Sequence, residues 1–275
     1  LAEQAGDEWV SACIRVTMGA AFVIASKDRQ AAKWLNRAGD SFRECNDLHG
    51  QAVTRLWQCL LWYRSNDITR LDRDLEQLLL LVRDHDYGFL LLRQTLLGPP
   101  DIRALVPLLL HAREIGLQSA YANYLLDKMG LAGLQNHPGY QLRVQSLGPF
   151  SVWLGHQELG SKSWKRQKAR QLFLLLLTYR RTQMHREQIA ETLWPDLDSR
   201  IAERDFKVAY TTLCRVLEPN RPRNRPSAFI LRDGSRYGIR PDADLWFDVA
   251  EFDSRIIKGD GLIHNHPKQA QKHYR

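Results

Sequence analysis

Hydrophobic and polar residues alternate along the first half of the chain with the period of an amphipathic α-helix, in which apolar positions recur every three or four residues. We expect seven helical segments, separated by short breaks at which Asp, Ser or Asn commonly acts as the N-cap of the next helix. The segments are 9–26, 28–46, 49–65, 68–84, 87–97, 102–116 and 118–130.

A weak internal repeat runs through these helices. An arginine followed by an acidic residue recurs near helix ends at separations of 40 and 30 residues, close to the period of helical-hairpin repeats. The pairs are Arg43-Glu44, Arg83-Asp84 and Arg113-Glu114. Residues 31–57 resemble a tetratricopeptide repeat (TPR), with small Ala32 and Ala38 where helices touch. Such stacks form concave surfaces that bind a protein or peptide, and the alternative, an all-helical domain with no ligand of its own, stays open.

The hydrophobic period shortens to two residues after a glycine-rich segment, Gly130 to Tyr140. Alternation through 142–148 and 149–159 predicts short strands, with a turn at Gly155-His156. The predicted parts are a TPR-like helical region at 1–133, a linker at 134–140, an α+β domain at 141–247 and the start of a further helical domain at 248–275.

Three helices and a hairpin follow these strands. The pattern predicts helices over 165–181, 186–194 and 199–217, the second one ended by Pro195. Segment 228–241 is typical of a β-hairpin, because Asp233-Gly234 is a strong turn signal. The predicted fold class is therefore mainly α, with an N-terminal helical array and a C-terminal α+β domain.

The helix over 199–217 has two different faces. Phe206, Tyr210, Leu213 and Leu217 recur at the spacing of a buried stripe. The opposite face carries four cations and one hydroxyl but no carboxylate. Its residues are Arg200, Arg204, Lys207, Thr211 and Arg215. A solvated surface is the simplest interpretation of such a face. The neighbouring segments must decide between this interpretation and a surface that binds a polyanion.

Charge is distributed unevenly along the chain. The net charge is +8, yet residues 1–140 hold 15 Lys/Arg against 16 Asp/Glu, whereas residues 141–275 hold 24 against 15. A basic domain attracts nucleic acid or an anionic membrane. Lys165 and Arg166 also lie at the start of a predicted helix, where the helix dipole disfavours cations, so an external anion there would offset that cost.

Other kinds of function lack the residues that they need. The spacing of the cysteines and histidines fits no metal site, and no Ser, His or Asp stands in a nucleophile-elbow motif, so we expect no enzyme and no cofactor. A GxxxxGK[ST] loop is absent too. No apolar run reaches the roughly 18 residues of a membrane span, and there is no signal peptide, so we expect a cytoplasmic protein that avoids membranes.

Two helices followed by a hairpin predict a helix-turn-helix with a wing. The apolar stripe would anchor the last helix, leaving its basic face free for the major groove of double-stranded DNA. Arg232 and Arg236, beside the hairpin turn, would reach the minor groove, whose negative potential attracts guanidinium groups.

The second half resembles the winged-helix domain of OmpR/PhoB-type response regulators, in the version found in Streptomyces antibiotic regulatory protein (SARP)-type activators. The matching segments are LRVQSLGPFSVWLG, QKARQLFLLLLTYR, REQIAETLWPD, RDFKVAYTTLCRVLEP and YGIRPDADLWFDVAEF. In that family a helical bacterial transcriptional activation domain follows the winged helix. DVAEFDSRI resembles its entry, so we expect the chain to be a piece of a longer polypeptide.

The resemblance also implies roles for single residues. Arg204, Lys207, Thr211 and Arg215 fall on the recognition-helix face, and Trp194 matches a tryptophan that touches a phosphate or belongs to the core. The loop that contacts RNA polymerase in relatives corresponds to Pro195, Asp196, Leu197, Asp198 and Ser199. Relatives often carry two basic residues where this chain has Thr211-Thr212, so the target sequence cannot be transferred.

The sequence therefore predicts a sequence-specific, DNA-binding transcriptional activator whose helical half senses or relays a signal. The alternative is a protein-interaction scaffold in which the helical repeats and the winged helix both dock protein partners, because a fold alone does not determine function.

Overall fold

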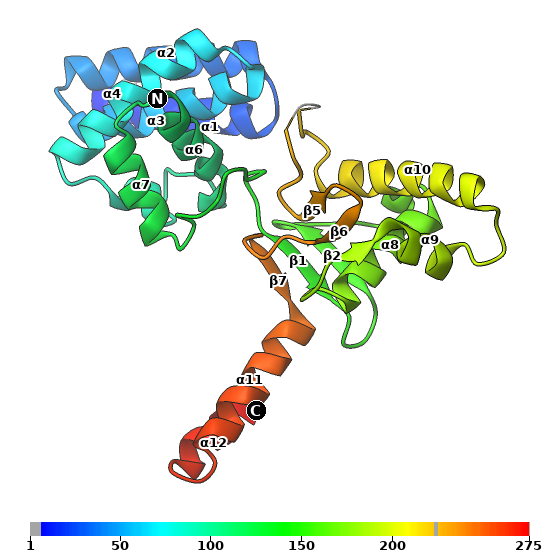
Figure 1. The fold of residues 1–275 in the computed structure, drawn as a ribbon. Coiled ribbons are helices and arrows are strands. Elements are labelled where there is room, and N and C mark those ends of the chain that lie inside the picture. The colour runs from blue at the N-terminus through cyan, green and yellow to red at the C-terminus, as the bar shows by residue number, and fades with distance from the viewer. Residues whose placement is uncertain (1–6, 223–224, 275) are drawn as a thin grey trace. The chain divides into compact units, whose positions relative to one another are not determined.

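The computed structural model describes residues 7–222 and 225–274. The chain divides into two compact units, Leu1–Gly139 and Tyr140–Arg275, and the division falls inside the predicted linker. Helices dominate the described residues and the strands are short, which confirms the prediction of a mainly α-helical chain (Figure 1).

Among its described residues, the first unit contains helices joined by loops and no strand. They are α1 (Glu8–Ile24), α2 (Asp28–Glu44), α3 (Leu48–Ser65), α4 (Ile68–Asp84), α5 (Phe89–Leu92), the 3₁₀ helix η1 (Ile102–Leu105), α6 (Val106–Ile115) and α7 (Ser119–Lys128). The side chains of Asp7, Asp47 and Asp67 accept backbone N–H groups at the starts of α1, α3 and α4, as expected of N-caps.

Close packing of neighbouring helices explains the small residues of this unit. A Cβ at Gly19 of α1 would lie 2.6 Å from the Leu35 side chain of α2, and a Cβ at Gly50 of α3 would lie 2.2 Å from the Phe42 ring. Leu35 and Phe42 are buried. Helix α2 therefore packs closely against both α1 and α3, and these glycines set how closely the helices approach.

One predicted helix is wrong. Residues 87–97 form only the four-residue α5, and the backbone becomes extended at Arg93. Leu90 and Leu91 enter the core, whereas Leu96 is 99% exposed, so the apolar run is shared between core and loop. Trp57 donates its indole N–H to the Leu97 carbonyl at 2.7 Å, a tertiary contact that the helical pattern could not reveal.

The second unit combines short strands with five α-helices in its described part. Its elements are β1 (Leu142–Gln145), β2 (Ser151–Leu154), β3 (Gln157–Glu158), the 3₁₀ helix η2 (Ser161–Trp164), α8 (Gln167–Thr178), β4 (Met184–His185), α9 (Arg186–Leu193), α10 (Ser199–Leu217), β5 (Ile230–Asp233), β6 (Arg236–Ile239), β7 (Leu245–Phe247), α11 (Asp248–Leu262) and α12 (Pro267–Tyr274). One sheet has the strand order β3-β2-β1-β7 and the other β4-β6-β5.

Two of these strands were not predicted. β7 pairs in parallel with β1, Leu142 opposite Leu245, so the ends of the predicted domain 141–247 meet in one sheet. β4 adds a third strand to the hairpin, with Met184 opposite Tyr237. Strands of two or three residues are too short to show a period and are defined by their partners.

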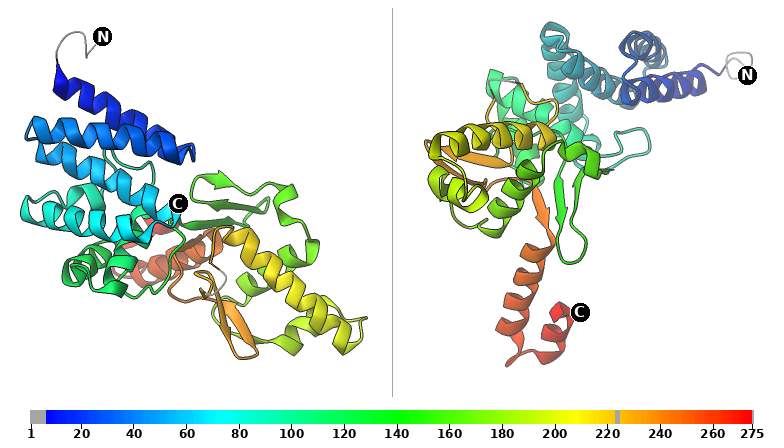
Figure 2. Two further views of the ribbon diagram at one scale, coloured as in Figure 1. Left: turned by 90° about the horizontal axis from the view of Figure 1, so that it is seen from above. Right: turned by 90° about the vertical axis from the view of Figure 1, so that its right-hand side faces the viewer.

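The core of the second unit forms around α8, α9 and α10, which lie together in Figure 2. Phe206, Leu213 and Leu217 of α10 are at most 1% exposed, and burying Phe206 contributes about 2–3 kcal/mol. The Phe206 ring meets Tyr237 of β6 edge-on at 4.8 Å, so the hairpin packs on α10. Tyr210, expected in the same stripe, is only partly buried at the edge of this core.

Helices α11 and α12 begin where β7 ends. Asp248 accepts the backbone N–H groups of Ser146 and Leu147, both at 2.7 Å, and so ties the start of α11 to the loop after β1. Gly259 and Tyr274 bring α11 and α12 together. Within 7–222 and 225–274, no helix is both long and apolar enough to cross a membrane.

Candidate nucleic-acid interface

The face of α10 opposite its buried stripe carries the predicted basic residues. Arg200, Arg204, Lys207 and Arg215 are all exposed, as is Thr211. Asp198 starts the helix by accepting the Arg200 N–H at 2.9 Å. Because the apolar stripe holds α10 against the core, this face cannot rotate inward, and its side chains remain available to a partner.

Two flanking carboxylates partly neutralise this face. Lys207 Nζ lies 3.0 Å from Glu203 Oε1, and Arg204 Nε lies 3.4 Å from Asp205 Oδ1. Glu203 also binds Arg186 at 2.9 Å. The hydrogen bond from Lys207, together with the positive charge of Arg186, lowers the pKa of Glu203, which therefore stays ionised. The sequence predicted a basic face without carboxylates. In the structure, Glu203 and Asp205 flank this face and pair with two of its four cations.

The other two cations of α10 are not neutralised. Among the described residues, no Asp or Glu oxygen lies within 4.0 Å of the side-chain nitrogens of Arg200 or Arg215. These guanidinium groups keep their full charge toward solvent and would attract an external anion.

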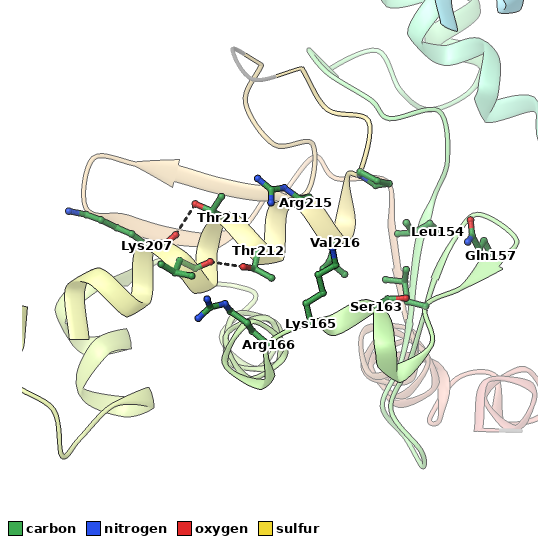
Figure 3. Close-up of a pocket in the computed structure, with 13 residues that line it drawn as sticks. Leu154, Gln157, Ser163, Lys165, Arg166, Lys207, Thr211, Thr212, Arg215 and Val216 are labelled. Atoms are coloured by element: carbon green, nitrogen blue, oxygen red, sulfur yellow. Dashed lines mark hydrogen bonds between the residues drawn. The ribbon is translucent and has the colours of Figure 1, made fainter. Parts of the chain in front are cut away.

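A pocket of about 850 Å³ opens beside α10 and gathers cations from two elements (Figure 3). Lys165 and Arg166, just before α8, line it together with Lys207 and Arg215 of α10. The 13 lining residues are Leu154, Gln157, Leu159, Ser163, Lys165, Arg166, Lys207, Val208, Thr211, Thr212, Arg215, Val216 and Pro219. None of these is a carboxylate, so the pocket itself is cationic.

The chain before α8 is positioned by a buried tryptophan. Trp164 is 6% exposed and stacks on Phe173 of α8 with ring centroids 5.9 Å apart. Lys165 and Arg166 follow at once and are exposed. α8 begins without a side-chain cap, so its first N–H groups and these two cations lie together at the positive end of the helix dipole. An anion is the partner that this arrangement favours.

The hairpin presents two further arginines. Arg232 and Arg236 are exposed on β5 and β6, beside the turn at Gly234, whose φ of +56° suits glycine. The Arg232 guanidinium lies 5.9 Å from the centre of the Tyr237 ring. Tyr237 in turn packs on Phe206 and Tyr210, so contacts with α10 hold the hairpin.

Trp194 lies in the core. Only 7% of it is exposed, and the Lys168 ammonium lies over its ring at 5.4 Å. This burial favours the core interpretation over the phosphate contact that the sequence left open. The loop after it, Pro195 to Ser199, is exposed throughout, and Leu197 keeps 41% of its surface in solvent.

Sequence reasoning missed an apolar row on α10. Val208, Thr212 and Val216 follow one another at i, i+4 and i+8 and line the pocket next to the cations. This spacing is visible in the sequence, but alone it indicates core as readily as a pocket wall.

A buried carboxylate anchors the end of α10, which the sequence did not suggest. Glu218 is 4% exposed and accepts the Ala228 N–H at 2.9 Å and the Ser227 hydroxyl. Burial raises its pKa, although these hydrogen bonds oppose the shift. Tyr140 adds a hydrogen bond from its hydroxyl to the Leu217 carbonyl at 2.8 Å. The last turn of α10 and the strand entering the hairpin therefore keep a defined register.

Comparison of the chain with family models, curated proteins and solved structures gave no match.

Proposed function

We propose that residues 141–247 form a winged helix-turn-helix domain of the OmpR/PhoB type, through which the chain binds double-stranded DNA as a transcriptional activator. The order of α9, α10 and the β5–β6 hairpin supports this proposal, since it is the order of a helix-turn-helix followed by a wing. The observation that carries it is the cationic pocket beside α10, formed by Lys165, Arg166, Lys207 and Arg215 without any carboxylate.

In this proposal α10 enters the major groove, which at about 12 Å wide admits a helix. Arg215, Lys165 and Arg166 bind phosphates, because they line one pocket and DNA presents phosphates along both edges of the groove. Lys207 exchanges Glu203 for a phosphate oxygen on binding. Arg200 and Arg204, in the first half of α10, bind further along the same groove.

The hairpin would act as the wing. Arg232 and Arg236 leave the two sides of its turn, and a narrow minor groove attracts guanidinium groups through its negative potential. Contacts of Tyr237 with α10 support a fixed distance between the two groups of DNA contacts.

We also propose that the first unit is a TPR-like array that binds a protein or peptide. Consecutive helices α1 to α4 pack against one another, and the glycine contacts between them support a regular stack. Its nearly balanced charge argues against a second DNA-binding surface.

Activation requires contact with the transcription machinery. We propose that the exposed loop Pro195–Ser199 makes this contact with RNA polymerase. Asp198 and Ser199 begin α10, whereas Asp196 and Leu197 take no part in its capping. Changing Asp196 to Asn together with Leu197 to Ala should abolish activation in a reconstituted transcription assay and leave DNA affinity within twofold. Equal transcription from both proteins would remove this role from the loop.

A salt titration of DNA binding tests the proposal as a whole. If about 5 to 7 phosphates are neutralised, the logarithm of the binding constant should fall with the logarithm of salt concentration at a slope of about −4 to −6. The duplex is first selected from a random library and then titrated by fluorescence anisotropy. A flat response, or no affinity for any duplex, would contradict the proposal and favour the scaffold alternative.

A further inference from the structure

We propose that Thr211 and Thr212 read thymine in the major groove through their methyl groups. This inference rests on the proposed DNA binding and specifies which base the centre of α10 recognises.

The hydroxyl groups of both threonines are already occupied. Thr211 Oγ1 donates to the Lys207 carbonyl and Thr212 Oγ1 to the Val208 carbonyl, each at 2.8 Å. Figure 3 shows both hydroxyls directed back to the preceding turn of the helix. A hydroxyl has a single hydrogen, so neither one has a hydrogen left to donate to a base or a phosphate. What these side chains can still offer to a base is an acceptor oxygen and a methyl group, and the methyl group is the one that can distinguish thymine.

The neighbouring residues on α10 extend this apolar surface. Val208 and Val216 lie one turn before and one turn after Thr212, and all three line the pocket. Lys207 and Arg215 stand one turn before and one turn after Thr211. The part of α10 that lines the pocket thus consists of two cations and four methyl-bearing side chains, with no amide or carboxylate side chain.

Base recognition by such a surface is restricted. Amide side chains read adenine and carboxylates read cytosine, and α10 offers neither at the pocket. Thymine differs from the other bases in the major groove by its 5-methyl group, which makes apolar contacts with side chains such as threonine. Since Thr211 lies at the centre of the cationic face, phosphate contacts on both sides would bring this methyl-rich surface against the base edges.

Replacing thymine by uracil tests the inference without changing the protein, because uracil lacks only the 5-methyl group. Each thymine of a selected duplex is replaced in turn, and affinity is measured by anisotropy. We expect replacement at one or two positions to weaken binding about fourfold each, the effect of removing one buried methyl group.

Matched variants assign the effect to the threonines. Thr211→Ser and Thr212→Ser keep the hydroxyl and remove the methyl, so they should bind thymine and uracil duplexes equally at the position concerned. Thr211→Val and Thr212→Val keep a methyl and remove the hydroxyl, so they should retain the preference for thymine. Circular dichroism establishes that each variant is folded.

The outcomes separate this inference from the proposed function. Tight, salt-dependent binding with no thymine preference would overturn the inference and leave DNA binding intact. Loss of the preference in the valine variants but not in the serine variants would assign recognition to the hydroxyls and overturn it as well. No affinity for any duplex would overturn the proposed function and this inference together.

Discussion

Helices α2 and α10 resemble each other in composition but differ in how their charges are arranged. Both are amphipathic, 17 and 19 residues long, and each carries four basic residues. On α2, Asp40 and Glu44 share the polar face with Lys33 and Arg37 at helical spacing, and Asp40 binds Arg43. On α10, Glu203 and Asp205 stand at the edges of the basic face, and no carboxylate of the described chain pairs with Arg200 or Arg215.

The difference shows that the positions of the acids, rather than the number of cations, decide what a polar face attracts. On a face with interspersed charges, the acidic and basic side chains pair with one another and the face remains solvated. A basic face with acids only at its edges keeps a net positive potential toward solvent. In the second unit Lys165 and Arg166 strengthen that potential from a separate element.

Charge reversal on the two helices should give the largest contrast. Lys207→Glu combined with Arg215→Glu should weaken DNA binding at least about 100-fold, because two contacts are lost and two repulsive charges are added. Both residues are exposed, so the fold should survive. The matched control is Lys33→Glu with Arg37→Glu on α2, which should change affinity less than twofold. Equal losses in both proteins would mean that only the net charge matters, and would contradict a site on α10.

Neutralising the wing should have a smaller effect. Arg232→Gln together with Arg236→Gln should reduce affinity about tenfold and lower the magnitude of the salt slope by about 2, one for each lost phosphate or groove contact. Anisotropy titrations at several salt concentrations measure both quantities. Arg255→Gln on α11, an exposed arginine outside the interface, is the control. An unchanged slope would remove the hairpin from the interface.

Releasing Lys207 from its acidic neighbour should have a moderate effect in the opposite direction. Glu203→Gln removes a charge that competes with phosphate for the ammonium group, so DNA affinity should rise about threefold at low salt. Asp40→Asn on α2 breaks a comparable surface pair with Arg43 and should leave affinity unchanged. If Glu203→Gln weakens binding instead, then Glu203 orients Lys207 rather than competing for it.

The burial of the Glu218 carboxyl predicts that the local stability at the end of α10 depends on pH. Because burial raises its pKa in the folded state, folding favours the protonated carboxyl. Its stabilising contribution is fully present below the unfolded pKa and declines as pH rises through the folded pKa. Relative to Glu218→Gln, the wild type should therefore lose protection as the pH rises above 4.5, the ordinary pKa of a glutamate carboxyl.

Hydrogen exchange of peptides spanning 213–230, corrected for intrinsic rates, measures this change at the end of α10. Peptides from α2 serve as the internal control and should show no difference between the two proteins. A constant gap between wild type and Glu218→Gln as the pH rises would contradict the assignment.

The parts of the fold that could be predicted from the sequence are those set by strong local signals. The stripe at Phe206, Leu213 and Leu217 fixes the inward face of α10, and Asp233-Gly234 fixes the hairpin turn. Segment 87–97 shows the limit of this reasoning. Its apolar residues fit a helix, but Trp57 and the core hold them in another conformation.

The site was less predictable than the helix that carries it. Helical spacing predicted that the cations of α10 share one face of the helix. It also placed Lys165 and Arg166 at the start of another helix. Their meeting in one pocket, the pairing of Lys207 with Glu203, and the burial of Glu218 depend on contacts between segments far apart in the chain or on side-chain conformation. Periodicity contains no information of that kind.

Lysine footprinting in the presence of duplex DNA tests the central claim most directly, because it locates the interface on the unmodified protein. The protein is acetylated with and without a selected duplex, and the reactivity of each lysine is read by mass spectrometry. We predict strong protection of Lys165 and Lys207, with Lys33 of α2 and Lys258 of α11 unchanged. If Lys165 and Lys207 react equally with and without bound duplex, the basic face of α10 is not the DNA-binding surface.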